Sequence, residues 1–175
     1  RRMSDATNPL LHPSVLPYQL PDFRAIRPEH YLPAFDAAFA EHRAEIERIT
    51  LVRSMPTFEN TIEAIESAGE TLERVAHAFY TVSSADATAE IQEIEEILAP
   101  LMAAHEDAIR LDARLYWRVA QVHENLAALG LTPEQRYLVE RHFREMTHAG
   151  AALDDEAKER LTALNQRLSA LSTTF

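Results

Sequence analysis

The amino-acid sequence predicts an all-α fold, and three observations carry that prediction. Only 3 of the 175 residues are glycine, so few positions suit the tight turns that join β-strands. The β-branched residues are scattered and do not alternate with polar ones. Apolar residues recur instead at spacings of three and four, the period of a helix with one buried face. We therefore expect about six amphipathic helices, mostly antiparallel, preceded by an extended proline-rich arm.

The arm occupies residues 1–28, because five prolines follow one another at short spacing between residues 8 and 28. Its apolar side chains are too many for a free tail, and we expect the arm to dock against a surface. These side chains are Leu10, Leu11, Val15, Leu16, Tyr18, Leu20, Phe23 and Ile26. Residues 29–175 are assigned to a helical N-terminal domain, a truncated part of a larger two-lobed protein.

The first helix is expected over residues 29–50, where one apolar stripe keeps the helical period. A loop at residues 54–56 separates it from a second helix, which begins near Thr57 and continues beyond Phe79. Gly69 lies on the apolar seam of this second helix. Its missing side chain is predicted to admit a close neighbour, at some loss of helix propensity.

The third helix follows the polar break at residues 83–86, and Pro100 inside it is expected to kink or divide it. The fourth spans residues 112–129 and stops at Gly130. The fifth has the clearest start, a capping box at residues 132–135 with proline in the first turn.

The last helix starts near Asp154 and repeats apolar residues at spacings of four and three up to Phe175. No cap, glycine or polar tail follows, so we expect the helix to continue in a longer protein. Side chains on these stripes should form the core. Those predicted to be largely buried are Phe58, Phe79, Val119, Leu161, Leu164 and Leu168.

Composition excludes several classes of function. Asp and Glu number 28 against 17 Lys and Arg, giving a formal net charge of −11 that would repel a nucleic-acid duplex or an anionic lipid surface. The absence of cysteine excludes a disulfide framework, a thiolate zinc site and a cysteine nucleophile. The N-terminus shows no apolar run typical of a signal peptide or membrane anchor. We expect a cytoplasmic protein with no nucleic-acid and no membrane partner.

Eight histidines justify a search for a metal site. The pairs His105-Glu106 and His123-Glu124 open like the zinc motif HExxH, but its second histidine is replaced by Ile109 and Ala127, respectively. Neither pair therefore completes the motif.

Glu145 and His148 have the Glu-x-x-His spacing of a di-iron site, but such a site needs that spacing twice and no second instance occurs. His42, His105 and His142 fall on or beside apolar stripes and are interpreted as hydrogen-bonded core or boundary residues. The glutamate clusters at residues 63–73 and 90–96 are interpreted as solvated helix faces. We predict no catalytic, no cofactor-binding and no metal-binding residue in this chain.

Two longer segments carry a family resemblance. The run Asn8-Pro9-Leu10-Leu11, followed by LPDFRAIRPEHYLPAFDAAFAEHRAEIERI at residues 20–49, resembles the opening of thimet-oligopeptidase-like zinc metallopeptidases. Within that family the similarity is to the peptidyl-dipeptidase (dipeptidyl carboxypeptidase) and oligopeptidase A branches, with the dipeptidase branch ahead. PTFENTIEAIESAGETLERV at residues 56–75 resembles the second helix of the same family.

The resemblance implies a parent enzyme several times longer, a helical two-lobed shell around a deep channel. Its zinc would be held by HExxH and a downstream glutamate, all outside this chain, so zinc is expected in the parent enzyme and none in this fragment. Short peptides would be the substrates, cleaved internally or with release of C-terminal dipeptides. This portion would form a channel wall or lid, partner the C-terminal catalytic lobe of the same chain, and self-associate when isolated. The alternative is an autonomous helical interaction or scaffold module.

Overall fold

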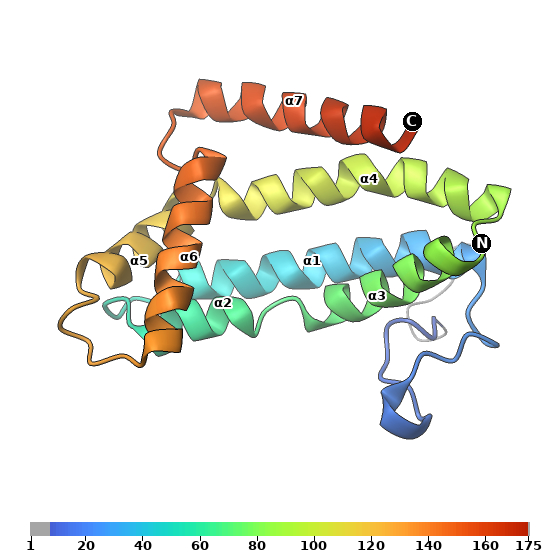
Figure 1. Ribbon diagram of the computed structural model, residues 1–175, viewed down its shortest axis with the longest axis horizontal. Helices are drawn as coiled ribbons and strands as arrows, with labels where there is room; N and C mark the ends of the chain where they lie inside the picture. Colours follow the sequence, from blue (N-terminus) through green and yellow to red (C-terminus); the bar gives the residue numbers. More distant parts are fainter. Residues whose placement is uncertain (1–7, 175) are drawn as a thin grey trace.

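The computed structural model describes residues 8–174 and is 73% helical (Figure 1). Within that range no residue lies in a β-strand, and the all-α prediction is confirmed. Six longer helices account for most of the described residues, and the short helix α2 and three short helical segments, Pro17–Gln19, Pro28–His30 and Phe58–Glu63, complete the helical part. The helices are α1 (Tyr31–Thr50), α2 (Ala64–Glu66), α3 (Glu70–Ala85), α4 (Ala89–Arg110), α5 (Ala113–Glu124), α6 (Pro133–Ala149) and α7 (Asp155–Thr174).

The long helices form an elongated stack (Figure 1). Helices α1 and α3 pack side by side and run in opposite directions, and α4 lies along α1 on the side away from α2. Helix α7 covers the outer side of α4 and runs antiparallel to it. Helix α6 crosses the ends of these helices near α5. The arm leaves the stack at the opposite end, beside the start of α1.

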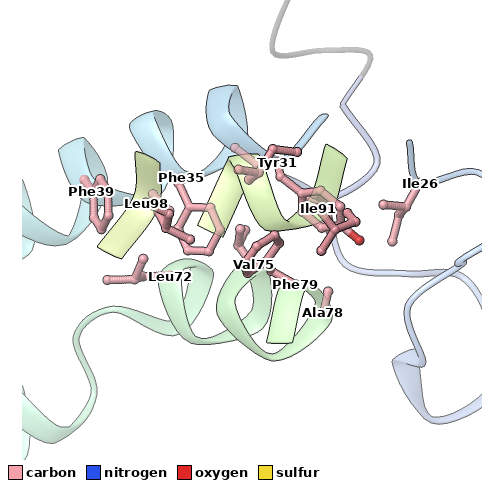
Figure 2. Close-up of a cluster of buried hydrophobic side chains, with 14 residues drawn as sticks. Ile26, Tyr31, Phe35, Phe39, Leu72, Val75, Ala78, Phe79, Ile91 and Leu98 are labelled. Atoms are coloured by element: carbon pink, nitrogen blue, oxygen red, sulfur yellow. The ribbon is translucent and has the colours of Figure 1, made fainter. Parts of the chain in front are cut away.

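One core cluster joins the arm to α1, α3 and α4 (Figure 2). The Phe79 ring contacts the rings of Tyr31 and Phe35 edge to face, with centroids 5.0 and 5.8 Å apart. Leu10 and Ile26 bring the two ends of the arm into this cluster. The arm therefore docks, as expected, through these two buried side chains.

Several apolar side chains in the middle of the arm face solvent. Val15 and Tyr18 are almost fully exposed, and Leu20 and Phe23 are also exposed. Short 3-10 turns at Pro17–Gln19 and Pro28–His30 interrupt the extended path that was predicted. The domain boundary at residue 28 stays a prediction.

A second core cluster joins the end of α1 to the segment Phe58–Glu63, α5 and α6. The predicted capping box of α6 is confirmed: the Thr132 hydroxyl accepts the Gln135 N–H, and the Gln135 amide oxygen accepts the Thr132 N–H. Asp112 caps α5 in a similar way. These caps satisfy N–H groups that a helix start leaves free, so they fix where α5 and α6 begin.

Two predicted helix boundaries were wrong. The second helix is divided, because Gly69 takes a left-handed conformation with φ 84° between α2 and α3. Pro100 lies inside α4 and does not divide it, so of the two expected outcomes the division did not occur and the kink stays a prediction. The fourth helix ends at Glu124, where the Asn125 side chain donates to the Gln121 carbonyl and satisfies a terminal acceptor.

The predictions of burial are correct for the side chains in the two core clusters but not for two of the leucines on α7. Phe58, Phe79 and Val119 are buried, which confirms those predictions, and Leu161 is half-buried. Leu164 and Leu168 are each 64% exposed, so the prediction for them was wrong.

The physical reason is that α7 contacts α4 through polar groups. The Asn165 amide donates to both Asp107 carboxylate oxygens, and the Ser169 hydroxyl donates to the Ala99 carbonyl. Leu164 and Leu168 each precede one of these polar residues, a rotation of about 100° around the helix. The exposed leucines of α7, namely Leu164, Leu168 and Leu171, therefore form a stripe beside the contact with α4. We call these three residues the leucine stripe.

Candidate functional site

Two histidines from different helices meet inside the stack. His42 Nδ1 on α1 lies 3.0 Å from His105 Nε2 on α4, a hydrogen-bond distance. His105 is only 4% exposed, and its ring lies against that of Phe39 with centroids 4.6 Å apart. A Cβ atom at Gly69 would lie 3.0 Å from the His42 ring. The prediction that Gly69 admits a close neighbour is confirmed, and that neighbour is His42.

The environment of this histidine pair favours the neutral imidazoles. Burial, together with the nearby His42 and Arg43, lowers the pKa of His105 to about 4. Burial also lowers the pKa of His42, an effect that the Glu45 carboxylate partly offsets. A neutral pair shares one proton between the facing nitrogens, whereas two charged rings would repel each other and lose the hydrogen bond.

The pair does not extend into a metal-binding cluster. His105 Nδ1 is buried without a hydrogen-bond partner, and Glu45 instead accepts the Gly69 N–H at 2.7 Å. No group of three or more His, Cys, Asp or Glu within the described residues has a geometry that could hold a metal ion. Zinc in proteins takes three or four protein ligands, so the residues described here do not fit a zinc site.

The pairs His105-Glu106 and His123-Glu124 lie in different parts of the fold and do not meet. His105 lies in the core as described, and His123 stacks on Phe143 with ring centroids 4.0 Å apart. Ile109 and Ala127 stand where the second histidine of the zinc motif would be required. Each histidine is therefore held by packing against its own neighbours.

The third candidate, Glu145 with His148, is also not assembled into a site. His148 is exposed, and the Glu145 carboxylate lies 3.9 Å from Arg141 Nε. His142 on the same helix bonds Glu66 Oε1 at 2.7 Å, and Arg141 Nη2 contacts the same oxygen at 2.7 Å. This ion-paired cluster ties α6 to α2.

The glutamate clusters largely face solvent. Glu90, Glu93 and Glu96 are exposed on α4, while Glu95 accepts the Ser83 hydroxyl at 2.6 Å. Such spacing along one helix face keeps charges in water and does not gather them around one point.

A buried arginine is the polar feature that sequence reasoning missed. Arg118 is 2% exposed, and its guanidinium donates to the Val52 carbonyl, to the Asn60 amide oxygen and to the Thr61 hydroxyl. No carboxylate pairs with it among the described residues, and burial lowers its pKa. The sequence could have indicated that Arg118 is buried, since it stands three residues after Leu115 and so lies on the same inward face of α5. Arg118 joins α5 to the loop after α1.

The structure thus defines a helical domain whose buried polar groups hold its own elements together. None of its helices within residues 8–174 is long and apolar enough to cross a membrane. No family model matches the chain.

The amino-acid sequence is similar to the sequences of several curated peptidases. The chain is 38% identical over 170 residues to dipeptidyl carboxypeptidase of Salmonella typhimurium and 38% identical over 168 residues to that of Escherichia coli. It is 27% identical over 169 residues to oligopeptidase A of Salmonella typhimurium. The chain is homologous to the N-terminal region of these thimet-oligopeptidase-family peptidases, which confirms the resemblance. The match with the first covers 97% of this chain but only 25% of the relative, so the chain spans about a quarter of such peptidases.

Proposed function

We propose that this chain is the N-terminal channel-wall or lid portion of a longer, cytoplasmic, zinc-dependent peptidase that cleaves short peptides. The observation that carries the proposal is the similarity along 97% of the chain to dipeptidyl carboxypeptidase. The higher identity to that protein, 38% against 27% for oligopeptidase A, favours release of C-terminal dipeptides over internal cleavage.

The chain itself is proposed to be non-catalytic. Zinc-dependent peptide hydrolysis needs two imidazoles, a third ligand and a general base around one ion. Four histidines of the described residues instead contact one another, Phe143 or Glu66, namely His42, His105, His123 and His142. The zinc and its ligands would therefore belong to a C-terminal catalytic lobe of the same polypeptide.

The leucine stripe supports contact with such a lobe. Its side chains stand at spacings of four and three, which suits packing against another helix. A stripe of this kind is costly in water, and contiguous apolar surface usually marks an interface. In the isolated chain we expect the stripe to promote self-association.

The alternative hypothesis is that the chain is an autonomous helical interaction module. The same leucine stripe favours it, because an exposed amphipathic helix is also what an adaptor presents to a partner helix.

Sequencing the gene beyond the codon for Phe175 separates the two. The peptidase proposal expects the same reading frame to continue and to encode HExxH with a glutamate further downstream. A stop codon directly after Phe175 would contradict it and leave the interaction module.

A further inference from the structure

A cavity of about 220 Å³ lies between the arm and α3, apart from the histidine pair and from Arg118. Its walls are largely apolar, formed by the arm residues Pro9, Leu10, Pro13, Pro21 and Ile26 and by Ala78 of α3. Ile26 and Ala78 lie at the arm side of the first core cluster (Figure 2). The floor of the cavity is therefore the core itself.

Arg74 places an unused positive charge in this wall. It stands one helical turn before Ala78 and lines the cavity. Its Nε is buried without a hydrogen-bond partner, and its Nη2 reaches only the Thr71 hydroxyl, at 3.5 Å. No carboxylate forms an ion pair with Arg74 in the part of the chain that the structure describes. A buried donor without an acceptor is costly, so an anion that accepts from this guanidinium would relieve that cost.

Asp22, the other charged residue in the wall, does not form an ion pair with Arg74. Asp22 lines the cavity, but its carboxylate accepts the Arg24 N–H at 3.1 Å and belongs to the local turn. Together with the net charge of −11, Asp22 disfavours a bare anion. A ligand for this cavity therefore needs an apolar body as well as a negative group.

We propose that the cavity binds a small carboxylate attached to a branched apolar group. Arg74 would donate hydrogen bonds to the carboxylate through its planar N–H fork, and the proline-lined wall would bury the apolar group. The cavity is smaller than the roughly 300–1,000 Å³ of a drug-sized pocket, which limits the ligand to about one amino-acid residue. Two sources share this chemistry: the carboxyl terminus of a peptide that ends in an apolar residue, and a free short-chain carboxylic acid. The assignment uses residues of this chain alone and stands whether or not the longer protein is a peptidase.

The test is to titrate the 175-residue chain with N-acetyl-leucine and follow backbone amide NMR shifts around Arg74 and Ile26. N-acetyl-leucinamide, which lacks the charge, and inorganic phosphate, which lacks the apolar group, should bind at least about tenfold more weakly. 4-Methylpentanoate distinguishes the sources, because affinity equal to that of N-acetyl-leucine favours a free acid and weaker affinity favours a peptide end. Failure of N-acetyl-leucine to bind, or equal binding of its amide, would overturn the proposal.

Variants assign the effect to Arg74. Arg74→Gln should weaken binding of N-acetyl-leucine by about ten- to a hundredfold, because a charge-assisted hydrogen bond is lost. Arg53→Gln, in the exposed loop after α1, is the matched control and should leave the affinity unchanged. Arg74→Lys keeps the charge and the fold but not the fork, so it should bind with intermediate affinity. Unchanged affinity in a folded Arg74→Gln or Arg74→Lys protein would refute the site.

Discussion

Replacing Phe79 by alanine is expected to lower the free energy of unfolding by about 3–5 kcal/mol. Phe79 is 0% exposed and contacts the rings of Tyr31 and Phe35 at centroid distances of 5.0 and 5.8 Å. The substitution removes buried apolar area, leaves a cavity and breaks edge-to-face contacts that contribute about 0.5–1.5 kcal/mol beyond burial. Since the free energy of unfolding of a domain is only about 5–15 kcal/mol, this single substitution would remove a large part of it.

Leu164→Ala is the matched control for that result. Leu164 has the same helical periodicity in the sequence but is 64% exposed on α7. Its loss should change the free energy of unfolding by no more than about 0.5 kcal/mol. Urea denaturation followed by helical circular dichroism measures both variants. A cost for Leu164→Ala comparable to that of Phe79→Ala would show that the stripe is buried against α4 and that the described packing of α7 is wrong.

The second large effect is a loss of stability as the pH falls from about 6.5 towards 4. Burial and, to a lesser degree, the neighbouring His42 and Arg43 lower the pKa of His105 from its ordinary value of 6.5 to about 4. Between these values the unfolded chain binds a proton on this residue that the folded chain does not bind. The neutral ring therefore makes its full contribution to the free energy of unfolding above pH 6.5. Below that pH the free energy of unfolding decreases by at most about 1.4 kcal/mol per pH unit.

Two variants separate this effect from other titrations. His105→Gln keeps a group that can hydrogen-bond to His42 but cannot titrate, so the dependence of stability on pH between about 4 and 6.5 should become shallower. His77→Gln, at a histidine whose side chain is 76% exposed on α3, should leave the wild-type slope unchanged. Denaturant midpoints at a series of pH values supply the slopes. An identical slope in wild type and His105→Gln would show that the pair is not held neutral by the fold.

Much of the fold was predictable because local rules determine it. The spacing of apolar residues located the helices, and the cap at Thr132 fixed the start of α6 without help from the rest of the chain. Gly69 was correctly expected to admit a neighbour, which is His42, but the apolar spacing did not predict its left-handed backbone, which divides the helix.

The error at α7 and the missed polar contacts share one physical cause. A helical period shows that α7 has an apolar stripe but not which neighbour covers it, and here Asn165 and Ser169 make the contact with α4. The His42–His105 hydrogen bond joins residues 63 positions apart, and Arg118 reaches partners more than 50 positions away. The apolar stripes correctly indicated that His42 and His105 are hydrogen-bonded core or boundary residues, but they did not indicate which distant residues are the partners.

The central claim is that this chain is a non-catalytic part of a longer peptidase. The most direct measurement is mass spectrometry of a short peptide incubated with the protein encoded by the whole reading frame, and separately with residues 1–175 alone. The account predicts that the whole protein removes dipeptides from the carboxyl end, that a metal chelator stops the reaction, and that residues 1–175 leave the peptide intact. An intact peptide after incubation with the whole protein, or zinc-dependent cleavage by residues 1–175 alone, would contradict it.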